Sequence, residues 1–207
     1  MSTFNWPMAI VCAVCGYLLG NFQTAIILSR SRFNKDIRNY GSGNAGSTNM
    51  LRVFGLDSGL LTFAGDFLKA LVAVLLGRAF MGTYGGYIAG GFVILGHCYP
   101  ALAGFKGGKG VACSLAVAWL VFPLGGLLAT ITAMVLLFTL KRVSLCSLAG
   151  TLVFSLSVFI LRSYDVPLVV LTVFILFHCV LRHWENIGRL IRGEEKPIEL
   201  KLNKSKK

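Results

Sequence analysis

Apolar blocks fill most of the chain, and short polar stretches separate them. The blocks cover residues 4–28, 56–80, 84–96, 111–121, 123–140, 144–161 and 166–181. Because a helix needs about 20 apolar residues to cross the hydrocarbon core of a bilayer, the first two blocks, the fifth, the sixth and nearly the last are long enough. Blocks 84–96 and 111–121 are too short, so we expect short helices whose connecting loop lies below the membrane surface.

The distribution of charge predicts how these blocks are oriented. The chain carries 20 Lys and Arg against 8 Asp and Glu, a net charge of +12. If the N-terminus is outside and all seven blocks cross, 17 of the 20 basic residues face the cytoplasm, as the positive-inside rule favours. Reading 111–140 as one helix gives six spans and puts Lys141 and Arg142 on the wrong side, and Pro123 is the cue for a break. We therefore predict an all-α integral membrane protein, a seven-helix transmembrane bundle with short and broken helices, an outside N-terminus and a cytoplasmic C-terminus.

Composition supports a single membrane-embedded domain over residues 1–207. Hydrophobic residues make up 56% of the chain and the mean hydropathy is +0.74, whereas soluble domains contain roughly 45–50% apolar residues. The first block is too long for a cleaved signal peptide, and we expect the polar, basic tail at 193–207 to lie against anionic headgroups. Cys12 and Cys15 lie in the first block and the other four cysteines are isolated, which favours buried thiols over a disulfide framework or a metal site.

Two lysines and four glycines stand together at residues 104–111. Glycines let backbone N–H groups turn toward one point, and a helix beginning at Val111 would add the positive end of its dipole. The pattern predicts a phosphate-binding loop formed by Lys106, Gly107, Gly108, Lys109 and Gly110. It is not a Walker A loop, because the Gly-x-x-x-x-Gly-Lys-Ser/Thr spacing is absent. A basic cytoplasmic turn would explain the lysines but not the glycines. His97, which precedes the loop, is a candidate for orienting or protonating a ligand oxygen.

A second polar stretch, at residues 36–52, places small hydroxyl and amide side chains among three glycines. Such groups suit a compact hydroxylated ligand, and an arginine one turn later would bind an anionic group. The candidate ligand-binding residues are Ser42, Asn44, Thr48, Asn49 and Arg52. The alternative is a turn with a helix N-cap at Ser47 or Thr48, for which one such residue is sufficient.

A third polar stretch, at residues 182–192, closes the last block. His183, Asn186 and Arg189 fall at i, i+3 and i+6 near one face of a helix, and Glu185 beside them is a candidate for structural support. The alternative is a solvated helix end with a tryptophan at the interface.

Two charged residues lie inside the second block. Asp66 and Lys69 are one turn apart and are expected to pair. Charges inside a span are costly and face the bundle interior, so we expect this pair to support one of the glycine loops.

The predicted topology brings all three polar stretches to the cytoplasmic side, which suggests a single site. The chain has no nucleophile elbow, no His-x-x-x-x-Asp pair of the soluble acyltransferase type and no metal-ligand set. A site rich in N–H donors, Lys and Arg but poor in bases suits a substrate that is already activated.

At these residues the chain resembles the bacterial membrane acyl-phosphate:glycerol-3-phosphate acyltransferase family. Residues 41–52, 96–112 and 183–194 are similar to its three signatures in the same order, and Asp66-Phe-Leu-Lys69 resembles its Asp-x-x-Lys. Two residues depart from the usual pattern: Trp184 stands where an arginine is common, and Ala70 where a glycine is usual.

The resemblance implies transfer of a fatty acyl group from acyl phosphate to the 1-hydroxyl of sn-glycerol 3-phosphate, giving lysophosphatidate and phosphate without an acyl-enzyme. It implies a multi-pass protein of the bacterial inner membrane whose site faces the cytoplasm. Glycerol 3-phosphate, long-chain acyl phosphate and membrane lipids are the expected partners, with a functional link to the soluble enzyme that makes acyl phosphate. We expect no cofactor, metal or nucleic acid.

On this hypothesis the loop at 106–110 holds the phosphate of the acyl donor, and the other two stretches hold glycerol 3-phosphate, with Arg189 among the ligands. The sequence is equally compatible with the two phosphate assignments being exchanged. The expected catalytic residues are His97, Lys109, His183 and Asn186, and the hydroxyl proton passes to a substrate phosphate, to His97 or to His183. The alternatives from other classes are a transporter of an anionic solute and a lipid-binding scaffold. Polar motifs on one side disfavour the transporter, and the scaffold leaves the Ser/Asn/Thr-rich loop unexplained.

Overall fold

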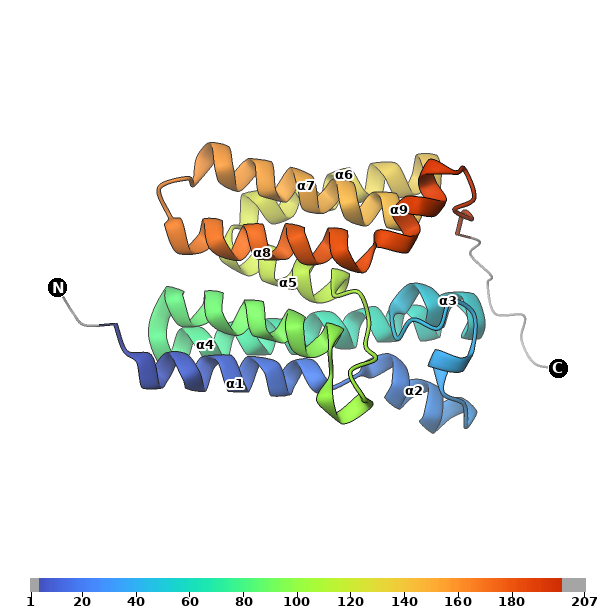
Figure 1. The fold of residues 1–207 in the computed structure, drawn as a ribbon, viewed down its shortest axis with the longest axis horizontal. Coiled ribbons are helices and arrows are strands. Elements are labelled where there is room, and N and C mark those ends of the chain that lie inside the picture. The colour runs from blue at the N-terminus through green and yellow to red at the C-terminus, as the bar shows by residue number, and fades with distance from the viewer. Residues whose placement is uncertain (1–3, 199–207) are drawn as a thin grey trace.

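A computed structural model describes residues 4–198 as an elongated bundle of helices (Figure 1). The helices are α1 (Trp6–Asn21), α2 (Thr24–Phe33), α3 (Ser47–Phe54), α4 (Leu56–Cys98), α5 (Val111–Val121), α6 (Pro123–Leu140), α7 (Val143–Leu161), α8 (Val166–Arg182) and α9 (Trp184–Ile191), with short 3-10 turns η1 (Ile37–Asn39) and η2 (Ala101–Ala103). The described part of the chain contains no β-strand, and the all-α prediction is confirmed. Of the tail predicted at 193–207, residues 199–207 lie outside the described part.

The chain reverses direction inside α4. Met81 (φ −144°, ψ 24°) and Gly82 (φ 61°, ψ −148°) leave helical geometry, and glycine permits the positive φ. The two arms approach so closely that a Cβ on Gly77 would meet the carbonyl oxygen of Gly85. The blocks expected at 56–80 and 84–96 are therefore antiparallel arms, seen as the teal and green helices in Figure 1.

A second reversal separates α5 from α6. Phe122 is non-helical (φ −149°, ψ 88°), and Pro123 begins α6 at a position where its missing N–H costs no hydrogen bond. The indole Nε1 of Trp119 donates to Thr130 Oγ1 at 3.0 Å, so the two helices lie side by side. The break expected at Pro123 is present, and a continuous helix over 111–140 does not form.

The helical pattern departs from the prediction in three places. The block at 4–28 is divided between α1 and α2 at Phe22 and Gln23. The third polar stretch does not continue the last long helix, because α8 ends at Arg182 and the α8–α9 pair is bent by 61°. The second stretch runs into a helix, α3, whose N-cap is Gly46 instead of Ser47 or Thr48.

Small residues let α1 pack directly on the second arm of α4. A Cβ on Gly16 would lie 2.6 Å from the carbonyl oxygen of Ala89, and one on Gly20 would lie 2.5 Å from that of Val93. Close backbone approach of this kind replaces the hydrophobic driving force that helices lack inside a bilayer. The main buried cluster joins α4, α5, α7 and α8 around side chains such as Val93, Val117 and Phe154.

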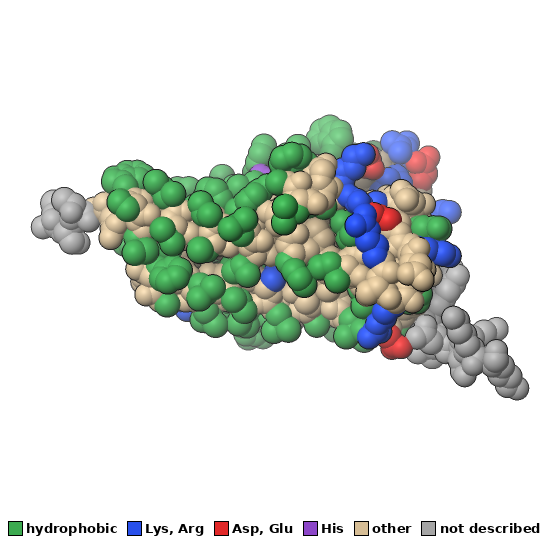
Figure 2. Space-filling model, turned by 90° about the horizontal axis from the view of Figure 1, so that it is seen from below, with side chains coloured by type: hydrophobic (Ala, Val, Ile, Leu, Met, Phe, Trp, Pro, Cys, Tyr) green, Lys and Arg blue, Asp and Glu red, His purple; other side chains and the backbone are tan. Residues whose placement is uncertain are grey.

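Hydrophobic and charged side chains separate along the length of the molecule. In Figure 2 hydrophobic side chains cover most of the visible face, and Lys, Arg, Asp and Glu gather at the end where α2, α3 and α9 lie in Figure 1. Among the described residues, four helical segments are long and apolar enough to cross a membrane, or five if the bent α8–α9 pair is one span. The seven-span count and the orientation of the termini stay predictions.

Candidate active site

The three polar stretches meet at the charged end of the bundle. Lys109 Nζ donates a hydrogen bond to Asn186 Oδ1 on α9, so the glycine-lysine loop contacts the third stretch. A Cβ on Gly108 would lie 2.9 Å from the carbonyl oxygen of Ala45, so the loop also lies against the second stretch. Segments that are far apart in sequence thus form one site.

The loop at residues 104–110 is held from the side of α8 as well. Arg182 Nη2 donates to the carbonyl oxygens of Gly107 and Gly108 at 3.3 and 3.0 Å. Gly107 and Gly108 are buried and Lys106 is exposed. A Cβ on Gly108 would meet His97 Nε2, which explains why this position needs glycine.

The loop ends at the N-terminus of α5. Gly110, the N-cap residue, has a φ of 81°, which glycine adopts without strain. The first N–H groups of a helix have no carbonyl partner one turn earlier and point out of its end. The loop therefore presents backbone donors and the positive end of the helix dipole next to Lys109, an arrangement that favours an anion.

Lys109 is half-buried among other cationic groups. Burial lowers the pKa of its ammonium group to about 8; the carboxylate of Glu195 opposes this shift, and Arg189 and Arg182 add to it. An anion arriving beside Lys109 would therefore stabilise a charge that the protein alone stabilises poorly.

Asn49 organises the second stretch. Its side-chain Nδ2 donates to the carbonyl oxygens of Tyr40 (2.9 Å) and Asn44 (3.1 Å), and its Oδ1 accepts from the backbone N–H of Ser42 (3.0 Å). Asn49 is only 1% exposed, so its amide shapes the loop, which differs from the expectation that it contacts a ligand. Ser42 and Arg52 are exposed, and Asn44 and Thr48 are half-buried.

Arg38 ties this stretch to the segment that leads into the glycine-lysine loop. Its Nη1 donates to the carbonyl oxygen of Ala103 at 2.7 Å, while Nε and Nη2 bind the carboxylate of Asp36 at 2.9 and 2.7 Å. The hydrogen bond from Arg38 holds the pKa of Asp36 well below its usual range. The pair fixes the approach of η2 to the second stretch.

Glu195 is the carboxylate that organises the third stretch. It is 6% exposed and accepts hydrogen bonds from Ser144 Oγ (2.8 Å), Asn186 Nδ2 (2.6 Å) and Arg189 Nε (2.8 Å). Burial opposes its ionisation, but these hydrogen bonds outweigh burial and keep the pKa of Glu195 below its ordinary value. Because Asn186 donates to Glu195, its Oδ1 is left to face Lys109.

The support expected from Glu185 comes from Glu195 instead. The side chain of Glu185 is 88% exposed, and its carboxylate approaches Arg189 only at 3.9 Å. On α9 it faces solvent, whereas the next residue, Asn186, is buried. Local sequence pattern cannot choose among the carboxylates of this region, because Glu195 lies beyond α9 and reaches the site only when the chain folds back onto α7.

Replacing Glu195 by alanine should lower the free energy of unfolding by about 1–3 kcal/mol, because the buried donors of Ser144 and Asn186 and the half-buried donor of Arg189 lose their acceptor. Thermal unfolding in detergent measures the change. Glu194→Ala is the matched control, since the Glu194 side chain is 57% exposed and its ion pair with Arg192 is a surface contact worth about 0–1 kcal/mol. Equal melting temperatures for the two variants would contradict the organising role of Glu195.

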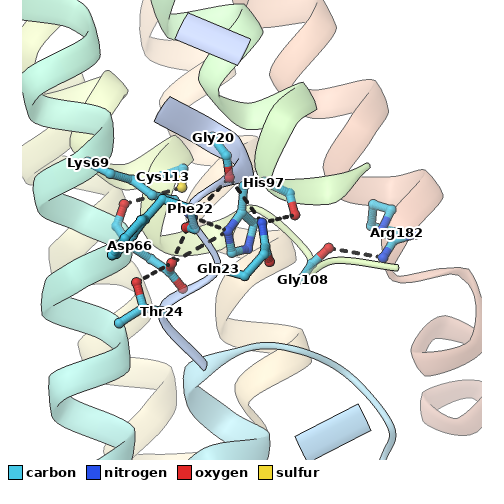
Figure 3. A network of polar contacts seen from close by, with 10 residues as sticks. All are labelled: Gly20, Phe22, Gln23, Thr24, Asp66, Lys69, His97, Gly108, Cys113 and Arg182. Atoms are coloured by element: carbon cyan, nitrogen blue, oxygen red, sulfur yellow. Dashed lines mark hydrogen bonds and ion pairs between the residues drawn. The ribbon is translucent and has the colours of Figure 1, made fainter. Parts of the chain in front are cut away.

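Beneath the loop, a buried polar network surrounds His97 (Figure 3). Lys69 Nζ forms the expected ion pair with Asp66 at 2.9 Å and contacts His97 Nδ1 at 2.8 Å. His97 is 3% exposed, and its carbonyl oxygen accepts from the N–H of Gly108 at 3.1 Å. The charged pair therefore backs the glycine-lysine loop through His97.

His183 stands at the bend between α8 and α9. Its Nδ1 lies 2.8 Å from the carbonyl oxygen of Cys179, which can only accept, so Nδ1 carries a proton and Nε2 of the neutral ring is a free base. His183 is 3% exposed, and Lys109 and Glu195 lie within electrostatic range of it. Nε2 is thus the unprotonated nitrogen available at the site.

Comparison with known proteins identifies the family. A family model described as glycerol-3-phosphate acyltransferase matches residues 10–193, nearly the whole chain. The chain belongs to the glycerol-3-phosphate acyltransferase family. The glycerol-3-phosphate acyltransferase of Alkaliphilus metalliredigens (strain QYMF) is 38% identical over 194 residues, covering 94% of this chain and 98% of the relative. Glycerol-3-phosphate acyltransferase 2 of Bacillus anthracis is 36% identical over 192 residues, covering 92% of this chain and all of the relative.

Solved structures of the glycerol-3-phosphate acyltransferase family share the fold. The glycerol 3-phosphate form of PlsY (YgiH), described as an integral membrane glycerol 3-phosphate acyltransferase, has a TM-score of 0.86 at 34% identity and covers 92% of this chain and 96% of its own. Its lysophosphatidic acid form has a TM-score of 0.82 at 32% identity, with 93% and 96% coverage. With the apolar helices, this likeness makes the chain a multi-pass membrane protein.

Within this acyltransferase fold, two contacts of the site lie outside the predicted set. Arg182 lies in the third stretch but is not among the residues expected to act at the site; its guanidinium binds the loop carbonyls and lies 5.2 Å from the centre of the Tyr99 ring. Gln23 Nε2 donates to the carbonyl oxygen of His97 at 3.2 Å. A polar residue inside the apolar block 4–28 is the feature of the sequence that points to such a buried contact. Across residues 4–198, no group of three or more His, Cys, Asp and Glu side chains is arranged to hold a metal ion.

Proposed function

We propose that this protein transfers a fatty acyl group from acyl phosphate to the 1-hydroxyl of sn-glycerol 3-phosphate, giving lysophosphatidate and phosphate, as the first acylation of phospholipid synthesis. The observation that carries the proposal is the contact of Lys109 with Asn186, because it joins an anion-binding loop to the polar face of α9. Membership of the glycerol-3-phosphate acyltransferase family supports the acceptor and the reaction class.

The two substrates divide the site between them. The loop at 106–110 and the first turn of α5 hold the phosphate of the acyl donor, with Lys109 as its main cation. The groups assigned to glycerol 3-phosphate are Ser42, Asn44, Thr48, Arg52, Asn186 and Arg189. Separate KM values test this division: a Lys109 variant should raise KM for acyl phosphate more than KM for glycerol 3-phosphate, and the opposite split reverses the assignment.

The reaction needs little basicity from the protein. The 1-hydroxyl oxygen attacks the acyl carbon, the bond from that carbon to the phosphate oxygen breaks, and phosphate leaves with the electron pair. Because the donor is a mixed anhydride, its phosphate is a good leaving group once Lys109 and the N–H groups of α5 neutralise its charge. The acyl group passes directly, without an acyl-enzyme.

Hydrogen bonding favours His183 over His97 as the acceptor of the hydroxyl proton. His183 donates through Nδ1 to the Cys179 carbonyl, which leaves Nε2 as a base. The Nδ1 of His97 faces the Lys69 ammonium group, which only donates, so the proton of His97 sits on Nε2 and the ring offers no free base to the loop.

The fatty acyl chain of the donor is the part of the substrates that contacts the membrane. The acyl chain lies between helices, open to the bilayer, while both phosphates remain at the charged end of the bundle (Figure 2). The positive-inside rule places that end in the cytoplasm, at the inner membrane, where acyl phosphate arrives from the soluble enzyme that makes it.

One assay tests the proposal directly. Detergent-purified protein is incubated with radiolabelled glycerol 3-phosphate and palmitoyl phosphate, and the label is extracted into organic solvent. We expect lipid-soluble label whose formation depends on both substrates. If all of the label remains water-soluble, the proposed reaction is refuted. Uptake of glycerol 3-phosphate into proteoliposomes then tests the alternative, transport of an anionic solute.

The lowered pKa of Lys109, about 8, predicts a pH dependence. The loop binds phosphate only while Lys109 is charged, so kcat/KM for the substrate it holds should fall about tenfold per pH unit above that value. The fall in kcat should come at higher pH, because bound phosphate stabilises the ammonium group. In an active Lys109→Arg variant the fall should vanish, since arginine stays charged; a fall that persists assigns the ionisation elsewhere.

A further inference from the structure

Lys69 is the centre of the buried network beneath the loop. Its ammonium group donates to the carbonyl oxygen of Phe22 at 2.6 Å, to Asp66 at 2.9 Å and to His97 Nδ1 at 2.8 Å. The carbonyl oxygen of Gly20 lies farther away, at 3.3 Å, so four acceptors surround the three hydrogens of the group. The side chains of Lys69 and Asp66 are 5% and 3% exposed, and Figure 3 shows them converging on His97 from the neighbouring arm of α4.

The position of Lys69 determines where His97 carries its proton. An ammonium group cannot accept a hydrogen bond, so Nδ1 of His97 must offer its lone pair and the ring proton must be on Nε2. Asp66 Oδ1 lies 3.6 Å from the same Nδ1. Asp66 and Lys69 of α4 and Arg182 of α8 are the charged groups that act on the ring. Without Lys69, the Asp66 carboxylate would become the nearest partner of Nδ1 and would draw a proton onto it.

His97 in turn holds the loop at Gly108. Its carbonyl oxygen accepts from the Gly108 N–H at 3.1 Å, and its Nε2 lies where a Cβ of Gly108 would be. Gln23 Nε2 donates to the same carbonyl at 3.2 Å. Gly108 is thus fixed between His97 on one side and Arg182 on the other, directly before the lysine that contacts Asn186.

We propose that Lys69 is a positioning residue for acyl transfer: it keeps His97 in the Nε2-protonated form, and His97 sets the position of Gly108 and hence of the phosphate loop. The inference rests on the proposed function for its link to turnover. The ion pair with Asp66 was expected only to support the loop. The proposal adds that Lys69 sets the proton position of His97, an effect that neutralising the charge of Asp66 would not produce.

A pair of variants separates positioning from simple charge pairing. Lys69→Met removes the ammonium group at similar volume and leaves Asp66 buried without its partner. The double variant Asp66→Asn/Lys69→Met removes both charges, and neutral replacement of a whole buried pair commonly restores stability. Melting temperature, KM for both substrates and the ¹⁵N signals of histidine-labelled protein are measured for each. With three histidines in the chain, a His97→Asn variant assigns the His97 signal.

Positioning predicts that the double variant recovers the melting temperature lost in Lys69→Met but keeps a raised KM for the loop-bound substrate, by about ten- to hundredfold. It also predicts an Nε2-protonated ring for His97 in the wild type and an Nδ1 proton in Lys69→Met. Recovery of both melting temperature and KM in the double variant overturns the proposal, as does an unchanged ring signal in Lys69→Met. If Lys69→Met does not fold, the double variant decides through its KM. Absence of acyl transfer in the wild type refutes the proposed function instead, and the ring signals still test the link from Lys69 to His97.

Discussion

Lys109→Ala should lower kcat/KM for acyl transfer by about 10²–10³-fold, the loss typical of removing one group that stabilises a charged transition state. The side chain is half-buried, and its ammonium group lies next to Asn186 at the junction of the loop and α9. Alanine leaves the backbone donors of the loop in place but removes the cation that neutralises the departing phosphate. Initial rates of lipid formation from radiolabelled glycerol 3-phosphate measure the effect.

Lys106 provides the comparison within the same loop. It carries the same charge three residues earlier but is exposed, so water screens its charge more strongly. Lys106→Ala should therefore cost less than about tenfold in kcat/KM. Equal losses in the two variants would mean that the loop acts through its overall charge, and near-wild-type activity of Lys109→Ala would refute the phosphate assignment. Melting temperatures in detergent establish that both variants are folded.

The gross architecture was predictable because apolar length and charge asymmetry are strong signals in a membrane protein. The reversals at Gly82 and Pro123 are marked by residues that permit or favour a break. The breaks at Phe22 and His183 carry no such mark. At the first of these, Lys69 donates a hydrogen bond to the carbonyl oxygen of Phe22. A side chain 47 positions away therefore pairs with a backbone group that the interrupted helix leaves without a partner. Such long-range compensation is invisible to a local pattern.

The segments that form the site were predictable, but the role of each residue within them was not. The predicted topology places the glycine-lysine loop and the other two polar stretches on one side. In the structure the loop contacts the third stretch through Lys109 and the second stretch at Ala45. Residue type alone could not separate Asn49, whose amide is used within its own loop, from the half-buried Asn44. Nor could it separate Glu195 from its exposed neighbour Glu194, because only the folded tail decides which carboxylate meets Asn186.

The proton acceptor is the remaining chemical step, and His183→Asn should lower kcat by about 10²–10⁴-fold with smaller changes in KM. Asparagine can retain a donor near the position of Nδ1, and so the hydrogen bond to the Cys179 carbonyl, while it removes the base at Nε2. The loss is therefore expected in turnover more than in stability, and steady-state rates together with melting temperatures separate the two.

The same measurement on His97→Asn decides between the proton acceptors, because the two rings have opposite proton positions. His97 uses Nδ1 as an acceptor from Lys69, so its replacement should disturb the loop and raise KM for the loop-bound substrate more than it lowers kcat. A larger kcat loss in His97→Asn than in His183→Asn would transfer the role of base to His97. If both variants retain kcat within about tenfold, below the usual contribution of a general base, the proton passes to a substrate phosphate oxygen, and the protein contributes charge neutralisation and orientation alone.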